Sequence, residues 1–234
     1  MKKLLFIIIF LFSFNSIQTL AQNDNSFTRT IGQGSDDAKV YSEHIEITSV
    51  DAVIGSTSGG GPCSFATRFT DIIVPQGATI DSAYLILISN ATASTANIDC
   101  IISMEDTADA PTFTSTYSPD YIDRHLTSAT VAWDDIGEWT SGSSYNTPDF
   151  KTSFQELVDR SDWDSGNAVV VFIRDNSSTT DHFRRIRTYE YVSTPKLAIL
   201  VVGYHTENEE ETAHYCNRYK SNNKYGLNRY NRKD

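Results

Sequence analysis

Short apolar runs separated by turn-forming residues recur along most of the chain. Some runs alternate apolar and polar residues, which is typical of strands with one buried face, and others are continuously apolar, which favours strands buried on both faces. The clearest examples are 80–89 and 168–174. The pattern predicts about nine short strands, at 38–48, 51–55, 64–70, 72–74, 80–89, 98–105, 168–174, 184–191 and 196–202.

One segment has a helical period instead. Thr147 is a suitable cap, Pro148 fits a first turn, and Asp149 suits the positive end of the helix dipole. The helix is expected to end near Arg160. Its apolar residues fall on one face, at i, i+4, i+7 and i+8: Phe150, Phe154, Leu157 and Val158. The pattern as a whole predicts an all-β fold, a jelly-roll β-sandwich with one short amphipathic helix.

The two ends of the chain differ from this body. Lys2 and Lys3 precede the apolar stretch 4–14, and Ala21 provides a cleavage site, so residues 1–21 are predicted to be a signal peptide. The apolar stretch of about 11 residues is shorter than the roughly 20 needed to span a bilayer. Residues 22–204 are predicted to be one secreted, extracellular domain. The polar tail 205–234 has almost no aliphatic residues and is expected to be disordered.

Charge and cysteine content narrow the function classes. Residues 22–204 carry 25 acidic and 11 basic side chains, a net of −14, which argues against nucleic-acid and anionic-membrane partners. Of the cysteines, Cys63 and Cys100 lie in the body and Cys216 lies in the tail. A Cys63–Cys100 disulfide and two buried thiols are equally compatible with the sequence.

No catalytic motif stands out, so a non-catalytic protein is expected. The stretch Gly55-Ser56-Thr57-Ser58-Gly59 has Thr where a nucleophile elbow needs Ser, and neither HExxH nor a P-loop is present. Carboxylate pairs for glycoside hydrolysis depend on spatial separation, so a small glycan-active hydrolase or lyase stays open as a less favoured alternative.

The candidate ligand site consists of aromatic residues among acidic ones. Sugar sites combine aromatic faces with planar polar groups, and Trp133, Trp139 and Tyr145 lie within 13 residues, shortly after Tyr121. The alternative is that both tryptophans pack in the core.

The only basic cluster of the body supplies a second candidate. Arg185 and Arg187 share one face of a predicted strand and are suited to a carboxylated or sulfated sugar. The alternative is pairing with the excess carboxylates of this chain. A structural Ca²⁺ is a further expectation, with Asp36 and Asp37 at the start of the domain as candidate ligands.

Several stretches together resemble secreted jelly-roll domains of the DNRLRE type, which are related to carbohydrate-binding modules. Within 68–85, the segments RFTDI, VPQGATI and AYL resemble the family pattern RF, then PxGA-x-I and A-x-L. Asp36-Asp37-Ala38 resembles an amino-terminal DDA, and Trp133 and Trp139 resemble a central tryptophan pair. Further matching segments are 154–158, 163–168 and 195–197, so the resemblance covers about residues 31–204.

The resemblance implies an extracellular module that binds polysaccharide or cell-surface glycan, or that accompanies surface proteins or modular enzymes. The runner-up is a structural or adhesive module of the matrix or envelope without sugar specificity. The signature segments themselves are mainly structural. Arg68, on an otherwise apolar strand, is expected to form an internal ion pair, and Pro75-Gln76-Gly77 is expected to form a turn.

Overall fold

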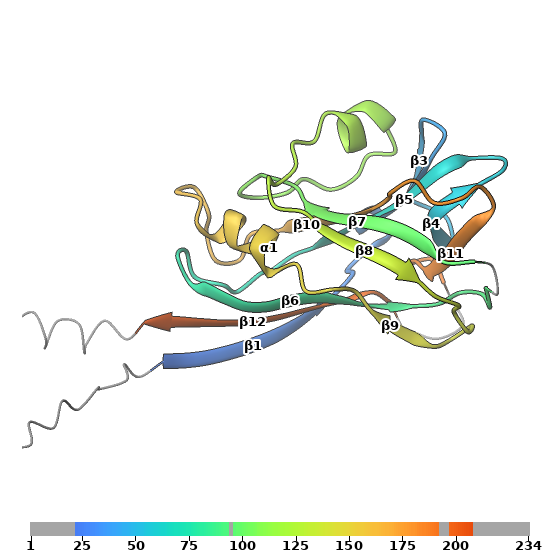
Figure 1. The fold of residues 1–234 in the computed structure, drawn as a ribbon. Coiled ribbons are helices and arrows are strands. Elements are labelled where there is room, and N and C mark those ends of the chain that lie inside the picture. Colours follow the sequence, from blue (N-terminus) through green and yellow to red (C-terminus); the bar gives the residue numbers. More distant parts are fainter. Residues whose placement is uncertain (1–21, 94–95, 192–196, 208–234) are drawn as a thin grey trace, which may run out of the picture. The chain divides into compact units, whose positions relative to one another are not determined.

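The computed structural model describes residues 22–93, 96–191 and 197–207, so the predicted signal peptide and nearly all of the tail lie outside the described residues (Figure 1). Within those ranges no helix has the length and apolar character needed to cross a bilayer. The elements in chain order are β1 (Gln22–Thr30), η1 (Gly34–Asp36), β2 (Asp37–Tyr41), β3 (His44–Glu46), β4 (Asp51–Thr57), β5 (Gly61–Phe69), β6 (Thr79–Ile88), β7 (Ile98–Met104), η2 (Ser118–Ile122), β8 (Val131–Ile136), β9 (Ser144–Asn146), α1 (Lys151–Val158), β10 (Val169–Asp175), β11 (His182–Arg187) and β12 (Ile199–Glu207).

Two sheets form a sandwich. The smaller sheet has the order β1-β12-β6-β9, and the larger has the order β11-β4-β5-β10-β7-β8, with β2 pairing with both β5 and β3. The chain crosses repeatedly between the sheets, from β5 to β6, back to β7, and again around β9 and β12, while α1 lies against β6 (Figure 1). The predicted all-β jelly-roll sandwich with one short helix is confirmed.

The larger sheet is buried on both faces over part of its area. Its inner face contributes Val169, Val171 and Ile173 of β10 to the main core, and Val170 and Phe172 enter a second cluster on the outer face. The long loop between β7 and β8, which carries η2, covers this outer cluster (Figure 1). Burial on both faces explains why the strand at 168–174 reads as a continuous apolar run.

Some predicted boundaries were wrong. The segment 38–48 is a hairpin of β2 and β3 rather than one strand, because Ser42 and Glu43 adopt φ values of +42° and +62° and reverse the chain. The helix begins at Lys151, so Thr147 does not cap it as predicted, whereas Asp149 lies at the positive end as predicted and its Oδ1 accepts the backbone N–H of Lys151 at 2.9 Å. The side chains of Thr147 and Asp149 also accept hydrogen bonds from the backbone N–H groups of Leu85 and Ala83 at 3.0 and 2.9 Å, which extends the pairing of β6.

The cysteines of the body are two buried free thiols, so the disulfide is excluded. Cys63 lies on β5 and Cys100 on β7, with β10 between them. Two strand spacings separate the Cα atoms by about 9.5 Å, beyond the roughly 7 Å that a disulfide allows.

Candidate functional site

A groove of about 620 Å³ opens on the outer face of the larger sheet, at the end that the β7–β8 loop leaves uncovered. Its floor is one row of paired residues across four strands: Val40, Ser64, Arg174 and Ile101, from β2, β5, β10 and β7. The other lining residues come from the β2–β3 hairpin, the β4–β5 turn at 60–62, the end of β10 at Asp175, and η2 with the residue before it. Ligand sites in proteins commonly have a volume of this size.

Tyrosine rings form two sides of the groove. Tyr121 of η2 and Tyr117, the residue directly before η2, have ring centroids 5.7 Å apart and a tilt of 30°. Tyr121 is fixed by a 2.8 Å hydrogen bond between its hydroxyl group and Ser64 Oγ, and by an edge contact with Phe172. Tyr41, from the end of β2, lines the same groove and stacks on His44 at 5.8 Å. All three tyrosines are half-buried, so part of each ring faces solvent.

Arg174 provides positive charge within the groove. Its Nη2 donates a 3.4 Å hydrogen bond to Ser103 Oγ, and its buried Nε has no hydrogen-bond partner among the described residues. Within the described part of this acidic chain, no carboxylate lies within ion-pairing distance of its guanidinium group. Arg174 therefore has donor capacity available for a bound molecule, next to the carboxylates of Glu43 and Asp175 that also line the groove.

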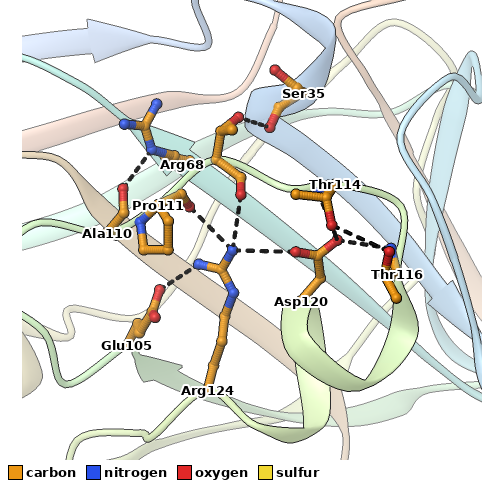
Figure 2. Close-up of polar contacts among 10 residues, drawn as sticks. Ser35, Arg68, Glu105, Ala110, Pro111, Thr114, Thr116, Asp120 and Arg124 are labelled. Atoms are coloured by element: carbon orange, nitrogen blue, oxygen red, sulfur yellow. Dashed lines mark hydrogen bonds and ion pairs between the residues drawn. The ribbon is translucent and has the colours of Figure 1, made fainter.

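A buried ionic network holds the loop that carries η2 (Figure 2). Arg124 Nη1 donates to Glu105 Oε2 at 2.5 Å, its Nη2 donates to the carbonyl oxygens of Pro111 and Thr112, and the Asp120 carboxylate lies at 3.7 Å. Asp120 Oδ2 in turn accepts hydrogen bonds from both backbone and side chain of Thr114, and from the backbone of Thr116. This network fixes the segment that positions Tyr117 and Tyr121.

Burial dominates the electrostatics of this network and of the groove wall. It raises the pKa of Glu105, while the neighbouring Arg124 charge and hydrogen bond lower that pKa. Burial also raises the pKa of Tyr117, with further contributions from Tyr121 and Glu43. The Tyr117 hydroxyl group is therefore protonated near neutral pH and is able to donate a hydrogen bond.

The predicted aromatic site is divided between two places. Trp139 is 3% exposed and belongs to the main core, where its ring stacks on Tyr145 at 4.5 Å and lies 6.2 Å from Trp133. Trp133 and Tyr145 are partly buried against the same core. Trp139 therefore packs in the core, which was the alternative to the ligand role predicted for it. Tyr121 lies apart from this cluster, in the groove on the outer face.

The predicted basic cluster is engaged within the protein. Arg185 Nη1 forms a 2.8 Å ion pair with Asp51, which is the alternative that the sequence left open. Arg187 is buried, with its guanidinium group 4.2 Å from the ring centroid of Tyr191. Arg184, directly before Arg185, is fully buried and donates to backbone carbonyl oxygens that include those of Ile136 and Gly137. None of the three lines the groove.

Asp36 and Asp37 are both buried at the start of the domain. Asp36 accepts a 2.8 Å ion-pair hydrogen bond from Arg68, as predicted for Arg68. Asp37 Oδ2 accepts the backbone N–H of Tyr189 at 2.8 Å. Glu190 lies close enough to Asp37 to act on its charge, and the buried Glu190 Oε2 has no hydrogen-bond partner among the described residues.

Asp37 makes the stability of the fold dependent on pH. Burial, with smaller contributions from Glu190 and Asp36, raises its pKa from 3.8 to about 8, despite the opposing hydrogen bond from Tyr189. A raised folded-state pKa contributes stability that is complete below the unfolded-state value and is lost as the pH rises to the folded-state value. The free energy of unfolding should therefore fall between pH 4 and pH 8, by up to about 1.4 kcal/mol per unit for this one group.

The substitution Asp37→Asn tests this dependence, because the amide oxygen still accepts the Tyr189 N–H but no longer titrates. Urea denaturation between pH 5 and pH 8, with a chelator present, should give the variant a shallower loss of stability than the native chain. Asp51→Asn serves as a control, because it removes a carboxylate on another strand. Equal slopes for the native chain and Asp37→Asn would show that Asp37 is ionised throughout this range.

Sequence reasoning missed most of the groove. Tyr121 was predicted as a ligand residue, but Tyr41, Glu43 and Arg174 were not; they come from the end of β2, the β2–β3 turn and β10. A signal for Arg174 exists in retrospect: it is a charged residue directly after the continuous apolar run 168–173. The pairing of β10 with β5 and β7 that places it beside Ser64 and Ile101 is not encoded in any local pattern.

Comparison with known proteins identifies no relative by sequence. No model of a protein family matches the chain, and no curated protein matches it. Among solved structures, the chain is similar to that of the mud crab tombus-like virus, with 11% sequence identity, coverage of 89% of this chain and 92% of that chain, and a TM-score of 0.28. A similarity at this level carries no argument about function.

Proposed function

We propose that the chain is a non-catalytic, secreted module that binds polysaccharide or cell-surface glycan in the groove on the outer face of the larger sheet. The observation that carries the proposal is the combination of three half-exposed tyrosine rings with Arg174, Glu43 and Asp175 in one open groove of about 620 Å³. Tyrosine rings suit the apolar faces of sugars, and guanidinium and carboxylate groups suit their hydroxyl groups. The resemblance to DNRLRE-type domains supports the same assignment.

The site proposed here differs from the one that the sequence favoured. Trp139 is too buried to stack on a sugar, and Arg185 is occupied by Asp51. Tyr121 keeps its role, joined by Tyr41, Tyr117 and Arg174. The glycan partner is the same, but its position moves from the tryptophan cluster to the groove.

Binding should depend on the groove tyrosines. We expect Tyr117→Ala and Tyr41→Ala each to weaken retention on the preferred polysaccharide by about 10-fold, which corresponds to about 1.4 kcal/mol. The measurement is affinity electrophoresis of residues 22–234 on a panel of neutral and anionic polysaccharides, followed by calorimetry on the best ligand. Tyr189→Ala is the matched control, because Tyr189 is 43% exposed and lies outside the groove.

Each outcome of this experiment separates the alternatives. Retention that is unchanged in both groove variants would place the ligand elsewhere. Absence of retention on every polysaccharide, with a folded sample, would favour the structural or adhesive module. Release of oligosaccharide products that stops in Glu43→Gln or Asp175→Asn would identify a hydrolase or lyase, because these are the carboxylates that line the groove.

We also propose that Ca²⁺ binds at the start of the domain, at Asp36 and Asp37, with Glu190 as a neighbouring carboxylate. The buried and unpartnered Oε2 of Glu190 supports the proposal, since hard oxygen ligands suit this ion. Millimolar Ca²⁺ should then raise the thermal midpoint of the native chain at pH 8 but not that of Asp37→Asn. An equal response of both proteins would remove Asp37 from the ligand set.

A further inference from the structure

A second group of potential metal ligands lies on the smaller sheet, away from the groove and from Asp36. Asp24, Asp81 and His205 each place one ligand atom within 4.8 Å of the others, the only such group in the described part of the chain. They come from β1, β6 and β12. Because β12 lies between β1 and β6 in the sheet, His205 lies between the strand that carries Asp24 and the strand that carries Asp81.

A β-bulge sets the position of Asp81. In the pairing of β12 with β6, Gly203 lies opposite Ser82 and Tyr204 lies opposite Ile80, so Asp81 has no partner residue on β12. A bulged residue is displaced from the regular alternation of a strand, which re-aims its side chain. The consequence is that Asp81 reaches His205, whose Nδ1 lies 2.9 Å from both Asp81 Oδ1 and Asp81 Oδ2.

The charges around the group favour a cation. The carboxylates of Asp24 and Asp81 are exposed, and His205 is the one described basic group within ion-pair distance of the Asp81 carboxylate. Lys151 on α1 donates to the backbone carbonyl oxygen of Asp81 at 3.3 Å rather than to its carboxylate. With a neutral imidazole the three side chains carry two negative charges, which match a divalent ion.

The ligand chemistry indicates which ion is favoured. One imidazole nitrogen and two carboxylate oxygens form a mixed set that suits Zn²⁺, whereas Ca²⁺ takes six to eight oxygen ligands. Three protein ligands leave a position for water in a four-coordinate site.

We propose that Asp24, Asp81 and His205 bind Zn²⁺ or a similar divalent transition-metal ion, which links β1 to β12 and β6. The ion would fasten β1, a strand at the edge of the smaller sheet, to its neighbours. A ligand that binds only the folded chain stabilises it in proportion to the logarithm of its concentration. At one hundred times its dissociation constant, Zn²⁺ should raise the thermal midpoint by about 5 to 10 °C.

The test is thermal unfolding and calorimetric titration of residues 22–234 with Zn²⁺ after removal of metal with a chelator. The Zn²⁺-dependent rise in midpoint should disappear in His205→Ala and shrink in Asp81→Asn, and Ca²⁺ should not reproduce it. His44→Ala, on the β2–β3 hairpin, is the matched control and should keep the full shift. His214→Ala combined with Cys216→Ser removes two further potential ligands of the chain and should also keep it.

The outcomes are decisive in both directions. A loss of the shift in His205→Ala together with one ion bound per chain in the His214 and Cys216 double variant would establish the site. An equal shift in His205→Ala, or no shift of the native chain at millimolar Zn²⁺, would overturn the proposal. If His205→Ala does not fold, Asp81→Asn and Asp24→Asn provide the same comparison, because asparagine keeps the size of each side chain.

Discussion

Replacing Arg124 with methionine should lower the free energy of unfolding by about 3 to 5 kcal/mol, since removal of one partner leaves a buried charge uncompensated. Arg124, Glu105 and Asp120 meet in one network (Figure 2), and each is less than a tenth exposed. The guanidinium group of Arg124 also lies 4.6 Å from the ring centroid of Phe113. Methionine keeps much of the apolar packing volume but provides no donor for Glu105 Oε2 or for the carbonyl oxygens of Pro111 and Thr112.

Urea denaturation of the native chain and Arg124→Met measures this loss, with Arg160→Met as the control. Arg160 also pairs with two aspartates, Asp106 and Asp162, but its side chain is 28% exposed, so its removal should cost only about 0 to 1 kcal/mol. Similar losses for the two variants would contradict the assignment of Arg124 as the buried anchor of the loop.

The deficit of Arg124→Met should also grow with pH. In the native chain, burial raises the pKa of Glu105 and Arg124 opposes that rise. Without Arg124 the folded-state pKa of Glu105 increases further, and a raised pKa contributes stability that is lost as the pH increases. The variant should therefore be closer to the native chain at pH 5 than at pH 8, and adding Glu105→Gln should reduce this dependence.

The loop that Arg124 anchors connects this stability to the groove. Asp120 lies within η2, between Tyr117 and Tyr121, and its carboxylate holds Thr114 and Thr116 as well as facing Arg124. A loosened loop would let both rings leave the groove wall. If the proposed glycan site is correct, Arg124→Met should bind glycan more weakly even under conditions where it is fully folded, whereas Arg160→Met should bind normally.

The spacing of apolar residues predicted the strands and the helix face whose burial depends on that spacing. The alternating run at 80–89 became β6, the continuous run at 168–174 became β10, and the helical face of Phe154 and Leu157 packs in the core. The hairpin turn at Ser42 and Glu43 was missed because neither residue is a typical residue for positive φ. β1 was missed because its sequence, QNDNSFTRT, has a single apolar residue.

The groove depends on long-range pairing, which no local pattern reports. Arg174 and Ser64 are 110 positions apart and become neighbours because β10 pairs with β5. The β7–β8 loop covers Phe172 but stops short of Arg174, and this partial coverage creates the groove. The sequence could suggest that Tyr121 contacts a ligand, but not that its neighbours would be Tyr41 and Arg174 rather than Trp133.

Trp139→Ala should lower the free energy of unfolding of the domain by about 3 to 5 kcal/mol, whereas Tyr117→Ala should leave it nearly unchanged. Trp139 is 3% exposed, stacks on Tyr145 at an interplanar angle of 6°, and exchanges backbone hydrogen bonds with Ala93. Removing the indole leaves a cavity that the sandwich fills only in part. Tyr117, in contrast, is on the groove wall and half-exposed.

The two substitutions together separate a core role from a binding role. Urea denaturation gives the stability of each variant, and calorimetry at a temperature where both are folded gives its glycan affinity. The fold predicts that Trp139→Ala loses stability and keeps affinity, and that Tyr117→Ala keeps stability and loses affinity. The reverse result, in which Trp139→Ala keeps stability and loses affinity, would return the ligand site to the tryptophan cluster. It would mean that the Trp139 ring contacts the glycan instead of packing in the core.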